Sequence, residues 1–156
     1  MLEKMCCFVG NRKIDITEEL ENRIYSIIFK LILEENINTF LFGSKSEFNS
    51  LCYEKVSKIK EKYPKINRVY VRAEFPEIDE GYQDYLLKYY ENTFFPENIL
   101  KAGKAVYIKR NFYMIDESEI CVFYYNENDL PKNRKSGTKI ALDYAIKKHK
   151  KIILLP

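Results

Sequence analysis

The sequence predicts a single-domain α/β protein with a Rossmann-like, mostly parallel sheet that helices cover on both faces. Short apolar runs alternate along the chain with longer segments in which apolar residues recur at helical spacing. The short runs are apolar at consecutive positions, which is typical of parallel strands buried on both faces. The chain has 156 residues, of which 46% are hydrophobic, so we expect one domain over residues 1–156.

The first predicted unit is a strand, a turn and a long helix. The strand is expected at residues 5–9 and the turn at residues 10–12. Asp15 and Glu18 form a capping-box pattern, which predicts a helix that continues to Glu35. The apolar stripe of this helix consists of Leu20, Ile24, Ile27, Ile28, Leu31 and Ile32.

The second predicted unit repeats the order of strand, small-residue loop and helix. A strand is expected at residues 39–42 and a loop at residues 43–46, and the helix that follows ends before Pro64. A third strand is expected at residues 69–71, and a polar loop then extends to Gly81.

The second half of the chain continues the alternation. Helical spacing of apolar residues predicts a short helix that contains Tyr82, Tyr85, Leu86 and Tyr89. Three more strands are expected, at residues 105–108, 120–125 and 151–155. A hydrophilic loop at residues 126–136 and a helix from about Thr138 to Lys148 lie between the last two.

Charge and hydropathy exclude several classes of protein. Lys and Arg total 26 against 23 for Asp and Glu, and the net charge of +3 is spread along the chain. This pattern does not indicate a nucleic-acid binder, but it leaves a small anion open as a partner. The longest apolar runs are too short to span a bilayer and no leader pattern begins the sequence, so we expect a cytoplasmic protein without membrane contact.

The cysteines and the histidine do not indicate a disulfide framework or a metal site. Cys6, Cys7 and Cys121 lie in strand-like runs and Cys52 in a helical one, without Cys-x-x-Cys spacing, so we expect buried reduced thiols. His149 is the one histidine and lies in a lysine-rich run typical of a solvated helix end. No metal and no cofactor are predicted.

Three loops leave the carboxyl ends of predicted strands, where open parallel sheets bind their ligands. Each loop alone is typical of a turn, but small residues before a helix also let backbone N–H groups approach a phosphate. Their joint placement predicts an anion site formed by Gly10, Asn11, Arg12, Gly43, Ser44, Lys45, Ser46, Ser136, Gly137 and Thr138. The Gly-x-Gly-x-x-Gly and Walker patterns are absent from the sequence, which argues against hydride transfer and ATP hydrolysis.

Four segments stand in the order of motifs of a known family. Residues 7–12 (Cys-Phe-Val-Gly-Asn-Arg) are similar to an opening strand with a Gly-x-Arg turn, and residues 42–52 to a glycine loop after the second strand. Residues 110–116 are similar to an Arg-Asn-x-x-Met segment, and residues 136–138 to a Gly-Gly-Thr loop. Over nearly its whole length the chain thus resembles the SLOG superfamily, whose relatives include the LOG (lysine-decarboxylase-like) proteins and the DNA-processing protein A group.

The resemblance implies a Rossmann-like domain that binds nucleotides or nucleotide-derived signals, including ADP-ribose derivatives, in prokaryotic and phage conflict systems. Carried over by position, Gly10 and Arg12 would face the nucleotide, residues 43–46 would hold phosphate, and residues 136–138 would close the site. The Arg-Asn segment adds two ligand-binding candidates, of which the arginine would supply a fixed cation that matches phosphate geometry: Arg110 and Asn111.

The sequence departs from the family pattern at several positions. Ser44 and Ser46 stand where relatives often have glycine, and Asn49 stands where they tend to carry aspartate. LOG enzymes, which cleave the glycosidic bond of nucleoside monophosphates, have a glutamate three residues after the threonine, where this chain has Ala141. The resemblance therefore implies no catalytic carboxylate at that place.

Several other side chains allow two interpretations. Tyr82, Tyr85 and Tyr89 are compatible with base stacking or a subunit contact, but their spacing favours core packing. The acidic residues after the third strand suit either contact with a ribose or acid–base chemistry, but solvation explains them at least as well. They are Glu74, Glu77, Asp79 and Glu80. Solvation is expected for Lys45. A position away from the site is expected for the acidic residues before the fifth strand, which are Asp116, Glu117 and Glu119.

Three functional hypotheses follow. The leading one is a nucleotide-binding module without catalysis, which acts as a sensor or sequesters a signal. The alternative is a nucleotide hydrolase that cleaves an N-glycosidic or phosphate bond with an acidic residue, supplied by the loop from Glu74 to Glu80 or from elsewhere. The third is a structural partner subunit with a vestigial pocket. A binder of this size needs a homo-oligomer or a separate effector to transmit a signal, so we expect a homo-oligomer.

Overall fold

A computed structural model of the chain describes residues 3–127 and 136–156. One sheet of parallel strands forms its centre, in the order β4-β3-β2-β1-β5-β6. The strands are β1 (Met5–Gly10), β2 (Thr39–Phe42), β3 (Asn67–Val71), β4 (Asn92–Phe94), β5 (Ile120–Tyr124) and β6 (Lys151–Leu155). The prediction of a Rossmann-like α/β fold with a mostly parallel sheet is confirmed.

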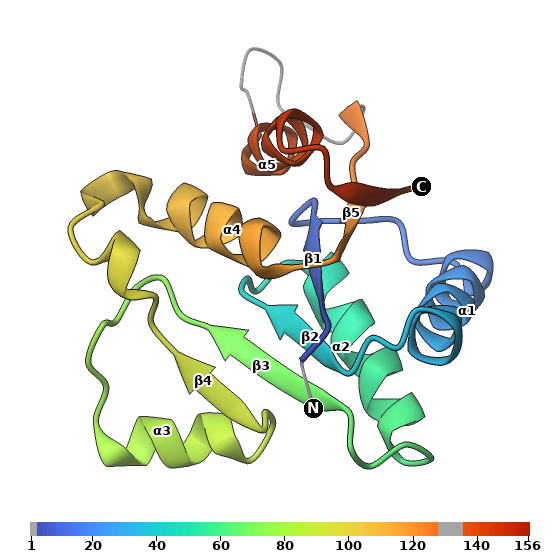
Figure 1. The fold of residues 1–156 in the computed structure, drawn as a ribbon, viewed down its shortest axis with the longest axis horizontal. Helices are drawn as coiled ribbons and strands as arrows, with labels where there is room; N and C mark the ends of the chain where they lie inside the picture. Colours follow the sequence, from blue (N-terminus) through green and yellow to red (C-terminus); the bar gives the residue numbers. More distant parts are fainter. Residues whose placement is uncertain (1–2, 128–135) are drawn as a thin grey trace.

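Helices cover both faces of this sheet (Figure 1). They are α1 (Glu18–Glu34), α2 (Glu47–Lys60), α3 (Glu80–Leu87), α4 (Val106–Glu117) and α5 (Gly137–Lys147). Successive residues of β1 point to opposite faces: Cys6 and Phe8 pack in the core with α1 and α2, whereas Cys7 and Val9 pack in the core with α4 and α5. Burial on both faces explains why the strands are apolar at consecutive positions.

Strand order reverses between β1 and β5. The chain first moves outward from β1 through β2 and β3 to β4, and α4 then returns it to the other side of β1, where β5 and β6 are added. A crevice beyond the carboxyl ends of the strands is expected at such a reversal. The turns after β1 and β5 therefore lie where the sequence places the ligand site.

The capping-box prediction for α1 is wrong by two residues. The helix begins at Glu18, and the N-cap is Thr17, whose hydroxyl accepts a hydrogen bond from the amide of Leu20 at 3.1 Å. Thr17 directly precedes the first helical residue, so its side chain reaches one of the amides that have no partner within the helix. Asp15 is exposed in the loop before the helix.

The strand predicted at residues 105–108 is also wrong. The segment ends a short 3₁₀ turn and begins α4, and the strand at that edge of the sheet is β4. The apolar side chains of residues 105–108 are half-buried or exposed, whereas Arg110, Met114 and Ile115 make the buried contacts of α4. A short edge strand of sequence Asn-Thr-Phe has one apolar residue, so its pattern does not predict a strand and β4 was missed.

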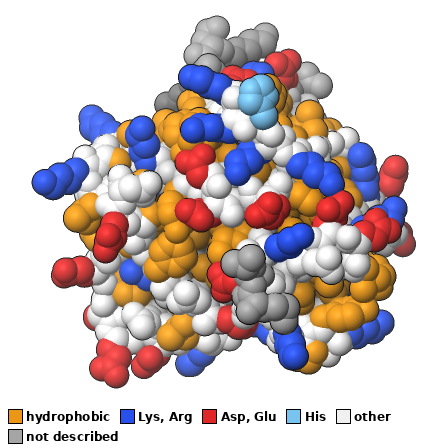
Figure 2. All heavy atoms as spheres, in the orientation of Figure 1, with side chains coloured by type: hydrophobic (Ala, Val, Ile, Leu, Met, Phe, Trp, Pro, Cys, Tyr) orange, Lys and Arg blue, Asp and Glu red, His pale blue; other side chains and the backbone are white. Residues whose placement is uncertain are grey.

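The four cysteines are buried and free, as predicted. His149 lies after α5 with a left-handed φ of 56°. Within residues 3–127 and 136–156, no three His, Cys, Asp or Glu side chains gather in a group that could hold a metal ion. None of the helices in these ranges is both long and apolar enough to cross a bilayer. Figure 2 shows basic and acidic side chains mixed over the face it displays.

Candidate functional site

The three predicted loops meet at the carboxyl edge of the sheet. They line a cavity of about 360 Å³, which we call the switch-point cavity because it lies beside the ends of β1 and β5. Ten of the predicted ligand-binding residues line it: Gly10, Asn11, Arg12, Ser44, Lys45, Ser46, Asn111, Ser136, Gly137 and Thr138. Contact of these residues with a ligand stays a prediction.

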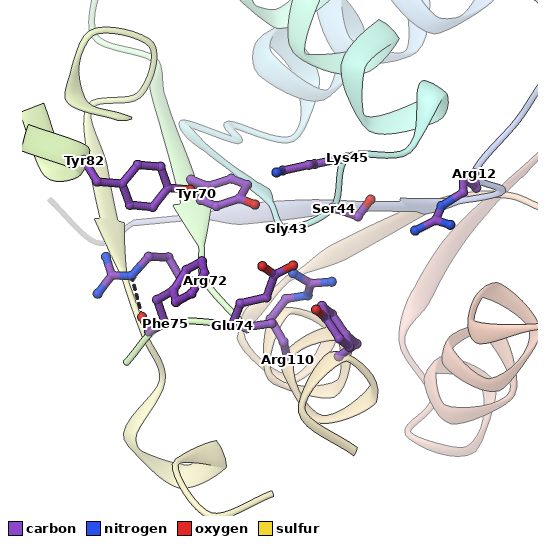
Figure 3. A pocket seen from close by; sticks show the side chains of 12 residues that line it. Arg12, Gly43, Ser44, Lys45, Tyr70, Arg72, Glu74, Phe75, Tyr82 and Arg110 are labelled. Carbon is purple, nitrogen blue, oxygen red and sulfur yellow. Dashed lines mark hydrogen bonds between the residues drawn. The ribbon is translucent and has the colours of Figure 1, made fainter. Parts of the chain in front are cut away.

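A neighbouring cavity of about 300 Å³ contains the other two predicted residues, Gly43 and Arg110. We call it the arginine cavity, because Arg12 and Arg72 also line it (Figure 3). Lys45 adds a fourth cationic side chain, whereas Glu74 is the one carboxylate among the lining residues. The excess of positive charge makes this cavity suited to an anion.

Arg110 is the most unusual side chain of the site. It is only 4% exposed, its Nε donates to Asn111 Oδ1 at 3.0 Å, and its Nη1 donates weakly to the carbonyl of Val71 at 3.5 Å. Burial lowers the pKa of its guanidinium to about 10, although Tyr70, Tyr107 and Glu74 favour the charged form. Within the described part of the chain, no carboxylate lies within ion-pair distance of it. A desolvated cation of this kind calls for an external anion.

Gly43 makes room for this arginine. A Cβ at Gly43 would lie 2.7 Å from Arg110 Cδ and 2.8 Å from Nε. The glycine after β2 therefore leaves the space that the outer part of the Arg110 side chain occupies. Figure 3 shows the Gly43 loop and the side chain of Arg110 close to one another.

Arg72 is a site residue that sequence reasoning missed. It follows β3 directly and is 9% exposed, and its guanidinium donates to backbone carbonyls of Phe75 and Pro76 and to Thr93 Oγ1. Burial lowers its pKa. The rule that singled out the other loops, a polar residue at the carboxyl end of a parallel strand, applies equally to Arg72 and would have found it.

The loop before α2 satisfies its own polar groups. Ser46 is the N-cap of α2 and accepts from the amide of Asn49 at 3.0 Å, and Ser44 donates to the Ser46 hydroxyl at 2.9 Å. The amide of Glu47 donates to the carbonyl of Arg12 at 2.8 Å. The amides of Gly43 and Ser46 and the hydroxyl of Ser44 thus donate within the protein, so the cations of the neighbouring loops are better placed to hold a phosphate than these three groups. Lys45 is exposed, as expected.

Asn49 joins the ends of β1 and β2. Its Nδ2 donates to the carbonyl of Phe8 at 3.1 Å, and its Oδ1 accepts from the amide of Gly43 at 3.3 Å. The side chain is 3% exposed. Asparagine both donates and accepts here, which an ionised aspartate cannot do.

Replacement of Asn49 by aspartate is therefore expected to lower the free energy of unfolding by about 1–3 kcal/mol, because a buried carboxylate would face the carbonyl of Phe8. Urea denaturation of the two proteins measures the difference. Asn98→Asp, at an exposed position, serves as the control and should leave stability unchanged. Equal stability of the wild type and Asn49→Asp would contradict the role assigned to this hydrogen bond.

Asn11 presents an oxygen without a partner beside the switch-point cavity. The residue is 3% exposed, and its Nδ2 donates to the carbonyl of Asn126 at 3.1 Å. Within the described residues, its Oδ1 is buried and accepts no hydrogen bond. A ligand hydroxyl or amine that donates to Asn11 would satisfy this oxygen.

The N-terminus of α5 forms another wall of the switch-point cavity. Ser136 caps the helix by accepting from the amide of Lys139 at 3.0 Å. Within residues 3–127 and 136–156, and apart from its chain neighbours and the backbone of its own helix, no atom lies within 4 Å of the ideal Cβ position of Gly137. The positive end of the helix dipole and the open space at Gly137 both suit an anionic group.

The prediction that Tyr82, Tyr85 and Tyr89 pack in the core is wrong; the first two lie on α3 and Tyr89 lies just after it. Tyr85 is 54% exposed and Tyr89 46% exposed, while Tyr82 is half-buried. Leu86 is the buried residue of this helix. The helix covers the edge of the sheet near β4, where little of the core remains to receive its other side chains.

Among the acidic residues considered in the sequence, Glu74 lies at a cavity, whereas Asp79 and Asp116 make contacts within the fold. Glu74 lines the arginine cavity, and a hydrogen bond to Glu74 raises the pKa of Tyr107, which lines the same cavity. Asp79 caps α3 by accepting from the amide of Tyr82 at 2.7 Å. Asp116 lies at the end of α4 and accepts from the Tyr144 hydroxyl at 2.8 Å, away from both cavities as expected. Tyr107 itself was missed because its segment was predicted as a strand.

No protein-family model and no curated protein matches the sequence. Among solved structures, the chain is similar to the Moco carrier protein of Chlamydomonas rheinhardtii, with a TM-score of 0.54 and 14% identity. The match covers 99% of this chain and 77% of that protein. At this identity the similarity establishes the Rossmann-like fold alone, and the assignment to the SLOG superfamily stays a prediction.

Proposed function

We propose that the protein binds a nucleotide or a nucleotide-derived signalling molecule, such as an ADP-ribose derivative, at the joined arginine and switch-point cavities. The observation that carries the proposal is Arg110, a buried guanidinium without a carboxylate partner within ion-pair distance in the described chain. Its phosphate partner would supply the missing negative charge. Arg12 lines both cavities and would share that phosphate.

The size and polarity of the site support a ligand larger than inorganic phosphate. The arginine and switch-point cavities measure about 300 and 360 Å³, and Arg12, Ser44 and Lys45 line both of them. Volumes in this range are typical of small-molecule sites. A phosphate between the two cavities would leave space on each side for the rest of a nucleotide.

Binding without catalysis is the form of the proposal that the residues favour. The position that carries a glutamate in LOG enzymes is Ala141, which is 1% exposed and lies on the face of α5 that packs in the core. A sensor or a sequestering protein needs no carboxylate there. The similar fold of a protein named as a carrier is compatible with this form of the proposal.

Thermal denaturation in the presence of candidate ligands tests the proposal. The panel contains AMP, NAD, ADP-ribose, its cyclic isomers and cyclic dinucleotides. A ligand at about 100 times its Kd should stabilise the folded protein by about 2.7 kcal/mol. The double variant Arg12→Ala, Gly137→Asp should lose this shift, because it removes a cation and places a carboxylate in the open space at Gly137.

The control is Arg23→Ala, which removes an exposed arginine from α1. The control should retain the full shift, and the double variant should unfold near the wild-type temperature when no ligand is present. An unchanged shift in the double variant would disprove this placement of the site. No shift with any compound would instead favour a role as a partner subunit.

A second candidate function is hydrolysis of the bound nucleotide, and the position of Glu74 favours it. Glu74 lines the arginine cavity beside Arg110, where a carboxylate could act as an acid or a base on a bound nucleotide. Chromatography of the products would detect released base or phosphate. Glu74→Gln should abolish turnover and Glu77→Gln, at an exposed position, should not; binding without product would exclude this candidate.

A further inference from the structure

We infer that the base of the nucleotide binds in a third cavity lined by tyrosines, next to the arginine cavity, so that base and phosphate occupy neighbouring subsites. The inference rests on the proposed function and adds to it the orientation of the ligand and its aromatic character. This tyrosine cavity measures about 320 Å³ and lies between α3 on one side and α2 and β3 on the other. The sequence pattern had assigned the α3 tyrosines to the core.

The floor of the tyrosine cavity is rigid and aromatic. The ring of Tyr90 lies with its centroid 5.1 Å from that of Tyr53 and 5.2 Å from that of Tyr70, and Phe42 supports it from the core. The Tyr53 hydroxyl donates to the carbonyl of Tyr89 at 2.6 Å, which fixes one end of the floor. Burial raises the pKa of Tyr70 and Tyr90, so both hydroxyls are neutral donors at physiological pH.

The opposite wall presents aromatic rings to solvent. Tyr82 and Tyr85 lie nearly parallel, with 13° between their planes and 6.2 Å between centroids, and Tyr89 makes an edge contact with Tyr85 at 5.3 Å. Packing within the protein does not account for these rings, because Tyr85 and Tyr89 are about half exposed. A planar base would remove this ring area from water and gain stacking contacts.

The tyrosine cavity continues into the arginine cavity. Four residues line both, namely Ser44, Lys45, Tyr70 and Tyr82. Figure 3 shows the side chain of Lys45 directed toward Tyr70 and Tyr82, while the Tyr70 hydroxyl points toward the Gly43 loop. Uncharged aromatic walls thus meet a cationic site without an intervening element. This order of apolar and cationic surface matches a base joined through a sugar to a phosphate.

The other alternative for exposed tyrosines, a contact between two copies of the chain, explains less. A subunit contact accounts for the outer rings of α3, but not for their continuity with the cavity around buried Arg110. Nucleotide binding accounts for both, because the base and the phosphate belong to one molecule. A nucleotide base is therefore the occupant inferred for the tyrosine cavity.

Calorimetric titration with AMP, GMP, CMP, UMP and ribose 5-phosphate separates the two subsites. At least one nucleotide should bind the wild type about tenfold more tightly than ribose 5-phosphate, which lacks the base. Tyr85 and Tyr89 line the tyrosine cavity but not the arginine cavity. Tyr85→Ala and Tyr89→Ala should each weaken that nucleotide about tenfold and leave ribose 5-phosphate unchanged, and Tyr85→Phe should retain the wild-type affinity. Leu87→Ala, on the same helix and 43% exposed, is the matched control and should change neither affinity.

The outcomes distinguish this inference from the proposed function. Equal affinity of every nucleotide and ribose 5-phosphate, with no effect of the tyrosine variants, would overturn the inference and leave phosphate binding intact. The inference would also be overturned if Tyr85→Ala dissociates a dimer in analytical sedimentation and binds nucleotides with wild-type affinity. Failure of all five compounds to bind the wild type at millimolar concentration would overturn the inference. The absence of a thermal shift with every compound of the earlier panel would overturn the proposed function as well.

Discussion

Arg110→Met is expected to abolish binding of phosphate-bearing ligands and, in the same protein, to stabilise the ligand-free fold. The guanidinium is 4% exposed, and its pKa is lowered to about 10 by burial, so the charge costs the folded protein free energy at neutral pH. Methionine keeps an unbranched apolar side chain beneath Gly43 and removes that cost. A side chain that lines a cavity and lowers the stability of the fold is expected to contact a ligand.

The expected effects are large enough to measure separately. Loss of a buried charge that pairs with a phosphate should weaken binding about 30-fold or more. The free energy of unfolding should rise by about 1 kcal/mol, since the lost hydrogen bonds to Asn111 and Val71 offset part of the gain. Urea denaturation measures the second effect, and titration with the ligand identified by thermal shift measures the first.

The pH dependence of this difference follows from the lowered pKa. Because the unfolded state binds the Arg110 proton more tightly than the folded state, wild-type stability gains relative to the variant as pH rises through about 10. The advantage of Arg110→Met should therefore be largest below that pH and shrink above it. A constant difference across this range would contradict the assignment of the cost to a buried charge.

Arg68→Met is the matched control for Arg110→Met. The Arg68 guanidinium is also largely covered, but it forms two hydrogen bonds with the Glu91 carboxylate, of 2.8 and 3.0 Å. Its removal should destabilise the protein, because Glu91 loses its partner. It should leave the affinity for ribose 5-phosphate unchanged, because Arg68 lines neither the arginine cavity nor the switch-point cavity. If both substitutions stabilise the protein, or if neither does, the lack of a carboxylate partner does not explain the effect of Arg110→Met.

Gly10→Ala is expected to give the largest loss of stability among single substitutions at the site. A Cβ at Gly10 would lie 2.3 Å from Phe48 Cδ2, 2.5 Å from Cγ and 2.7 Å from Cβ. Phe48 is fully buried, and its Cβ is fixed to the backbone of α2, so the ring cannot move away without shifting the helix. Overpacking of this kind costs about 3 kcal/mol, which should lower Tm by about 6–12 °C.

Gly137→Ala is the contrasting variant, because nothing lies within 4 Å of its ideal Cβ. Alanine is a better helix former than glycine, so the Tm should stay the same or rise slightly. Thermal denaturation of both variants in the absence of ligand checks the pair. Equal Tm values would mean that Gly10 is not required for the contact between β1 and α2.

Much of the fold was predictable because its causes are local. The apolar runs at β1, β2, β5 and β6 and the helical stripes of α1 and α2 follow from residue spacing alone. Where local spacing was ambiguous, the prediction failed: the apolar run at residues 105–108 suits a strand as well as the first turn of a helix. β4 was missed because an edge strand of three residues carries almost no pattern.

The clustering of the predicted site residues was also predictable, since one topological rule places loops after parallel strands at the same edge of the sheet. Contact of these residues with a ligand stays a prediction. All twelve predicted residues line the two cavities around Arg12. The individual roles were less predictable. Gly10 and Gly43 look like phosphate-loop glycines in the sequence, but their missing side chains make room for Phe48 and Arg110.

The sequence by itself determined the alternation of strands and helices and the positions of the polar loops, because periodicity and turn residues act over a few neighbours. Only the tertiary structure decided which charges are buried and which rings are exposed. Arg110 loses its water because α4 packs it beneath Gly43, and the α3 tyrosines keep theirs because the sheet ends at β4. Solvent access depends on contacts between residues far apart in the chain, and it is solvent access that makes these side chains candidates for binding a ligand.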